Sequence, residues 1–146
     1  MIDNRTASAI DLALQKYDTP VGPVFVAEHH GRMKKCFSRD TAIRYLAFFM
    51  TSHTFERSGF QQRYLDAQEI HPKNPEINRS VRGSITFEYF RAHQRCIRRL
   101  RRILARKREM QKWCEKWDSM HDRFVKEVNA LKASKPAEVR NGSHSI

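Results

Sequence analysis

Residues 84–135 read SITFEYFRAHQRCIRRLRRILARKREMQKWCEKWDSMHDRFVKEVNALKASK. These 52 residues contain no Gly and no Pro, and they are rich in Arg, Lys, Glu, Leu, Met and Ala. Because such residues favour helices, the stretch predicts one helix of roughly 70 Å, at about 1.5 Å per residue. The alternative is a break near Asp118 and Ser119 that makes a helical hairpin.

An apolar row runs along this predicted helix at seven-residue spacing. Its members are Tyr89, Cys96, Ile103, Met110, Trp117, Phe124 and Leu131. This spacing is typical of a helix that packs lengthwise against another helix. The row keeps its phase past Asp118, which favours one helix over a hairpin. Trp113 and Met120 widen the distal half, so we expect residues 110–131 to pack on the N-terminal unit or on a second chain, as a homodimer.

Positive charge is concentrated in the proximal half of the same stretch. The 146-residue chain has a net charge of +12, and residues 79–112 hold twelve basic and two acidic side chains. Ten of the twelve bases are Arg, whose planar guanidinium suits phosphate and carboxylate oxygens. The candidate contact residues for an anionic partner are Arg91, Arg95, Arg98, Arg99, Arg101, Arg102, Arg106, Lys107, Arg108 and Lys112.

Neighbouring Arg side chains on this helix repel one another. Like charges three or four positions apart cost about 0.2–0.5 kcal/mol per pair, and a partner that neutralises them removes that cost. The two acidic residues of the segment are expected to form ion pairs within the helix, Glu88 with Arg91 and Glu109 with Lys112.

Residues 1–83 predict a small α+β unit, so the expected fold class is α+β, mostly α. The spacing of Ile10, Ala13, Leu14 and Tyr17 predicts a helix over 5–17. Two extended runs meet at His30-Gly31 and predict a β-hairpin over residues 24–37.

The remainder of this unit predicts further short elements. Ser38 is a typical N-cap for a helix over about residues 39–51. Ser58 is expected to cap a short helix that contains Phe60, Tyr64 and Leu65. Two Pro residues predict a loop over 71–76, and residues 136–146 are expected to form a disordered tail.

Catalytic and metal-binding patterns are weak. His29, His30 and Cys36 lie close in sequence, and His93 precedes Cys96 by three positions, but structural zinc sites need paired short ligand spacings. A thiol in the apolar row acts as a small apolar side chain. No Gly-rich phosphate loop is present. We therefore expect a protein that is not an enzyme, with no catalytic residue, no metal and no cofactor.

The composition also bears on localisation. No stretch approaches 18 uncharged apolar residues, and residues 1–20 contain Asp3, Asp11, Lys16 and Asp18, so we expect neither a membrane span nor a secretory signal peptide. Three Cys residues do not make a disulfide framework. A reduced, cytoplasmic protein is the expectation.

The charge block predicts the class of partner. We expect a non-enzymatic nucleic-acid-binding protein whose Arg-rich segment contacts phosphates, with DNA and RNA both open. The alternative is a protein-interaction module or inhibitor of the phage or plasmid accessory type, which docks its basic helix on an acidic, nucleic-acid-binding surface of a host protein. A third possibility is a homo-oligomer joined by the apolar row.

Overall fold

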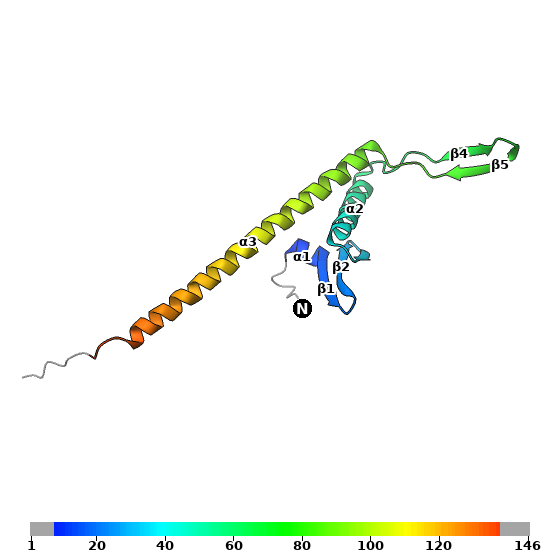
Figure 1. Cartoon of the computed structure of the whole chain (residues 1–146). Coiled ribbons are helices and arrows are strands. Elements are labelled where there is room, and N and C mark those ends of the chain that lie inside the picture. The colour runs from blue at the N-terminus through cyan, green and yellow to red at the C-terminus, as the bar shows by residue number, and fades with distance from the viewer. Residues whose placement is uncertain (1–7, 138–146) are drawn as a thin grey trace, which may run out of the picture. The chain divides into compact units, whose positions relative to one another are not determined.

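The computed structural model describes residues 8–137, which form an α+β fold with a long C-terminal helix, as predicted. The elements in chain order are α1 (Ala9–Ala13), β1 (Leu14–Thr19), β2 (Gly22–His29), β3 (Arg32–Cys36), α2 (Arg39–Ser58), β4 (Ala67–His71), β5 (Asn74–Val81) and α3 (Phe87–Ala133) (Figure 1). The chain divides into two units, Met1–Ile103 and Leu104–Ile146. The predicted tail lies outside the described residues from position 138 onward.

The first sheet is antiparallel, with the strand order β1-β2-β3. The predicted hairpin is confirmed as β2 and β3, which pair His29 with Arg32. The turn residues His30 and Gly31 both have positive φ, 47° and 78°. A type I′ turn requires this conformation, and its twist matches the twist of the two strands.

Of the helix predicted over residues 5–17, only Ala9–Ala13 is helical: residues 5–7 lie outside the described residues, Ser8 is the N-cap, and β1 begins at Leu14. Thr19 and Gly22 pair across a two-residue turn, and the Thr19 hydroxyl donates to the Gly22 carbonyl. This turn lets β1 pair with β2 back to Leu14 opposite Ala27. A full ladder of interstrand hydrogen bonds thus replaces the last turns of a short helix, which is marginal by itself.

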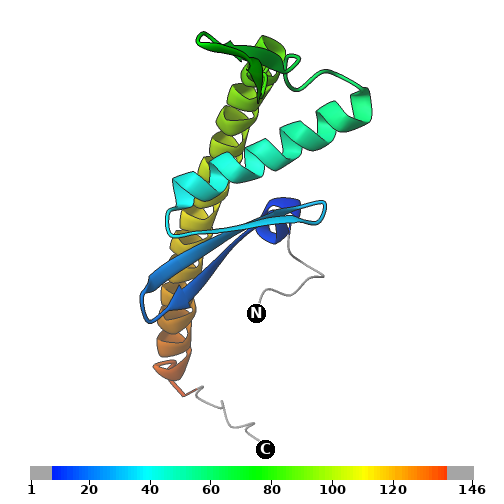
Figure 2. The same ribbon diagram turned by 90° about the vertical axis from the view of Figure 1, so that its right-hand side faces the viewer.

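Helix α2 covers one face of the three-stranded sheet (Figure 2). Its buried face includes Ile43, Leu46 and Phe49, and the sheet contributes Ala27 and Cys36 to the core. The helix begins after Ser38 as predicted, but it ends at Ser58 rather than near residue 51. No Gly or Pro interrupts it before Gly59, which adopts the left-handed conformation common at helix C-termini.

The segment between α2 and α3 contains a second sheet that sequence reasoning missed. The predicted short helix around Phe60, Tyr64 and Leu65 is wrong, because these residues lie in an irregular connection. The predicted loop over 71–76 is a two-residue turn that joins β4 to β5. All residues of this hairpin except Val81 are exposed, so its formation depends on backbone pairing more than on burial.

The base of this hairpin is closed by a close backbone approach at Gly83. The Gly83 amide donates to Asp66 Oδ1 at 2.8 Å, and the Tyr64 amide donates to the Ser84 carbonyl at 2.9 Å. A Cβ atom at position 83 would lie 1.9 Å from the Tyr64 carbonyl oxygen. The two segments therefore meet here only because residue 83 has no side chain.

Candidate nucleic-acid interface

Helix α3 is one continuous helix of 47 residues that begins at Phe87 rather than at Ser84. Thr86 sets this start, because its Oγ1 accepts a hydrogen bond from the Tyr89 amide at 3.2 Å. The same hydroxyl donates to the Gln61 carbonyl at 2.9 Å, and the Thr86 side chain is buried. The N-cap thus holds the first turn of α3 against the connection that follows α2.

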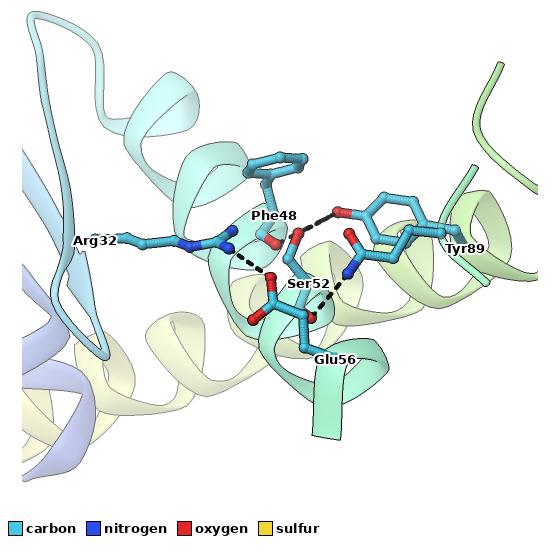
Figure 3. Close-up of polar contacts among 6 residues, drawn as sticks. Arg32, Phe48, Ser52, Glu56 and Tyr89 are labelled. Atoms are coloured by element: carbon cyan, nitrogen blue, oxygen red, sulfur yellow. Dashed lines mark hydrogen bonds and ion pairs between the residues drawn. The ribbon is translucent and has the colours of Figure 1, made fainter. Parts of the chain in front are cut away.

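Tyr89 fixes the rotation of this part of α3 about its own axis. Its hydroxyl lies 2.7 Å from Ser52 Oγ, and both side chains are almost fully buried (Figure 3). The Tyr89 ring meets the rings of Phe48 and Phe55 edge-on, at 6.3 and 5.2 Å between centroids. Burial raises the pKa of Tyr89, partly opposed by the Ser52 hydrogen bond. Because Tyr89 points to α2, the opposite face of the helix points to solvent.

A second contact between α2 and α3 is ionic, and it involves one of the predicted contact residues. Arg101 Nη2 lies 2.7 Å from Asp40 Oδ1, while Arg44 Nε donates to Asp40 Oδ2 at 2.9 Å. The hydrogen bonds from Arg44 and then from Arg101 hold the pKa of Asp40 below its usual value. Arg101 therefore has a partner within its own unit and contributes to the fold.

Four of the other predicted residues lie together on the exposed face of α3. At 3.6 residues per turn, Arg91, Arg95, Arg98 and Arg102 lie on the side opposite the buried residues Tyr89, Ile97 and Leu100. We call these four residues the Arg face. All four are exposed, and none takes part in the ion pairs found among residues 8–137. Arg91 lies over the Phe87 ring, 5.5 Å from its centroid.

The rest of the predicted set is distributed over the same helix. Arg99 is exposed in the first unit, and Arg106, Arg108 and Lys112 are exposed in the second, whereas Lys107 is half-buried. The predicted pairs Glu88–Arg91 and Glu109–Lys112 are wrong, since neither occurs among the ion pairs of the described residues. Exposed pairs gain little, because ordering two long side chains costs entropy.

A cluster of three His rings was missed by sequence reasoning. The rings of His30 and His53 stack 3.8 Å apart, and His29 meets His30 edge-on at 4.3 Å. Burial, and then the neighbouring His residues, lower the pKa of His29 and of His53. Within residues 8–137, no group of three or more His, Cys, Asp or Glu is placed to hold a metal ion. Only the adjacency of His29 and His30 was visible in the sequence, because His53 comes from α2.

The two cysteines of the first unit have raised thiol pKa values. Cys36 is buried and Cys96 is half-buried, and burial raises the pKa of both thiols. The charge of Lys34 lowers the pKa of Cys36, and a hydrogen bond with Thr51 lowers the pKa of Cys96, but each effect is smaller than that of burial. Cys36 acts as a small apolar side chain of the core, and Cys96 lies at the edge of the core beside Thr51.

In the described part of the chain, no helix combines the length and apolarity needed to cross a membrane. Comparisons with protein-family models, curated proteins and solved structures found no match.

Proposed function

We propose that the chain binds nucleic acid through the Arg face. The observation that supports this proposal is the exposure of Arg91, Arg95, Arg98 and Arg102 on one side of a helix whose other side is fixed by Tyr89. Successive members are three or four residues apart, a rise of about 4.5–6 Å. Phosphates follow one another by about 3.4 Å of axis on each strand, so one Arg serves every one to two phosphates.

The binding energy comes mainly from charge. Each guanidinium that contacts a phosphate releases a condensed counterion, and contact also relieves the repulsion between neighbouring Arg side chains. A helix with its side chains is about 10–12 Å across, close to the width of the major groove of B-DNA, about 12 Å. Phosphate contacts of this kind fix the position of the protein and carry no sequence information by themselves.

The test is the salt dependence of binding to fluorescently labelled duplex DNA and to single-stranded RNA, starting at about 50 mM salt. If six phosphates are neutralised on the duplex, log K falls with log salt at a slope of about −5. Affinity then drops about 10³-fold when the salt concentration rises fourfold. Absence of binding to both nucleic acids at the lowest salt would contradict the proposal.

A pair of matched variants separates the Arg face from general positive charge. Replacement of Arg91, Arg95, Arg98 and Arg102 by Gln is expected to reduce the slope to about −2, because four of six contacts are lost. The control replaces four exposed Lys residues elsewhere by Gln and removes the same charge, and it is expected to keep the slope. The control residues are Lys16, Lys35, Lys126 and Lys132. Equal losses in both variants would show that the Arg face has no special role.

A pull-down with the same variants separates a nucleic-acid ligand from an acidic protein. The tagged chain is used in a pull-down from lysate with and without nuclease treatment. Nucleic acid that is retained without nuclease, and is lost with the Arg-face variant, supports the proposal. A protein partner that survives nuclease treatment and depends on the same four Arg residues would replace it.

A further inference from the structure

The second unit exposes a row of large apolar side chains along α3. Six residues that share one side of the helix are each 52–74% exposed: Met110, Trp113, Trp117, Met120, Phe124 and Leu131. Isolated exposed apolar side chains are common, whereas a contiguous group of this size marks an interaction surface. We call these six residues the distal seam.

The spacing of the distal seam specifies a helical partner. From Met110 to Phe124 the intervals are three, four, three and four residues, which is the a/d pattern of a coiled coil. A seven-residue repeat drifts by about 20° per heptad on a straight α-helix, so only a second helix that winds around the first can cover it throughout. Helix α3 of another copy provides a surface of the required length and spacing.

The area of the distal seam is sufficient for a stable pair. At roughly 60% exposure, large side chains of this kind each offer about 100–150 Å², and six offer roughly 700 Å² per copy. Two copies would then bury about 1,400 Å², which lies within the usual range of about 1,200–2,000 Å² for specific interfaces.

Charged residues at the two ends of the seam indicate its orientation. Continuing the pattern places Arg106 before Met110 and Glu127 after Phe124, both at d positions. In a parallel pair each would face its own copy, which brings like charges together. In an antiparallel pair with Trp117 opposite the Met120 of the second copy, Arg106 and Glu127 occupy neighbouring layers at each end, so opposite charges meet.

We propose that two copies of the chain associate through the distal seam as an antiparallel coiled coil in this register. An open depression lined by Arg106, Glu109, Met110 and Trp113 lies at one end of the seam. In this register it receives the Phe124 and Glu127 side chains of the second copy, and Arg106 at its edge meets the incoming carboxylate. The register also brings Lys116 beside the second copy's Arg123, but both are exposed and water weakens their repulsion.

The first experiment measures the mass of the nuclease-treated full chain by sedimentation over a range of concentrations. We expect twice the 17.3 kDa chain mass at high concentration, with dissociation on dilution. Trp117→Ala is expected to yield a monomer with unchanged circular dichroism, while Glu115→Ala, on the outer side of the same helix, keeps the dimer. A monomeric wild type at about 100 μM would overturn the proposal, as would a dimer insensitive to Trp117→Ala.

The second experiment tests the register by charge reversal. Arg106→Glu and Glu127→Arg are each expected to weaken association at least tenfold, and the double variant is expected to restore it. In a parallel pair each charge faces its own copy before and after reversal, so the three variants would match the wild type and overturn the register. Because no nucleic acid is present, these results do not depend on the proposed nucleic-acid binding.

Discussion

Removal of one hydroxyl at Tyr89 is expected to destabilise the contact that turns the Arg face toward solvent. Tyr89→Phe keeps the ring contacts with Phe48 and Phe55 but leaves Ser52 Oγ without its partner at 2.7 Å. Ser52 is 1% exposed, so water does not replace the lost bond. A buried hydroxyl left without a hydrogen bond costs about 1–3 kcal/mol, and we expect a loss of unfolding free energy in that range.

The partner substitution completes a double-mutant cycle. Ser52→Ala leaves the Tyr89 hydroxyl with only the Phe48 carbonyl at 3.5 Å, so a similar loss of about 1–2 kcal/mol is expected. The double variant removes both polar groups and is expected to be more stable than the sum of the two losses implies, by about 1 kcal/mol. Urea unfolding followed by circular dichroism measures each free energy, with Tyr45→Phe, on the exposed side of α2, as a control expected to change it by less than about 0.5 kcal/mol. Additive losses of unfolding free energy, or no loss in Tyr89→Phe, would show that the hydrogen bond between Tyr89 and Ser52 does not stabilise the fold.

Three further predictions concern the first unit. Gly83→Ala is expected to cost about 1–3 kcal/mol in urea unfolding, because the new Cβ meets the Tyr64 carbonyl at 1.9 Å, whereas Ser84→Ala at the next, exposed position is nearly neutral. The pKa of Asp40 is lowered, so its contribution to stability is present above the usual value of 3.8 and is lost as pH falls through the lower folded value. Acid unfolding should therefore begin at higher pH in Asp40→Asn than in the wild type. An unchanged acid unfolding curve would contradict the stabilising role of the ion pairs. The pKa values of His29 and His53 are lowered, so the unfolded state binds more protons below 6.5 and stability falls as pH drops from about 7 to 5. We expect His53→Gln to flatten this fall in melting temperature, and an unchanged fall would contradict the role of His53.

Features set by local composition were predictable from the sequence. The long helix follows from 52 residues without Gly or Pro, and the exposure of Arg91, Arg95, Arg98 and Arg102 follows from their position opposite Tyr89. The turn at His30-Gly31 was also visible, because two extended runs flank Gly31, which accepts a positive φ without strain. In each case the local residues favour the observed conformation without contacts to distant parts of the chain.

Features that depend on pairing between distant residues were not predictable. The apolar spacing in β1 predicts a helix, and only its pairing with β2 makes it a strand. The β4–β5 hairpin contains Pro72 and Pro75, and because Pro is typical of loops, its strands were not predicted. The role of Arg101 was hidden for the same reason, because its partner Asp40 lies 61 residues away. His53 joins the other His residues only because α2 returns along the sheet.

The apolar row shows most clearly what a sequence pattern can and cannot establish. Seven-residue spacing correctly identified residues that share a helix face, but one continuous row suggested one continuous interface. In the first unit Tyr89 is buried against α2, whereas in the second unit Met110, Trp117 and Phe124 are more than half exposed. The spacing predicts which side chains pack against an apolar neighbour, but it does not predict whether that neighbour belongs to the same chain or to a second one. In the proposed dimer, Arg106 and Glu127 supply this information, because opposite charges meet at the ends of the distal seam only when the second helix runs in the opposite direction.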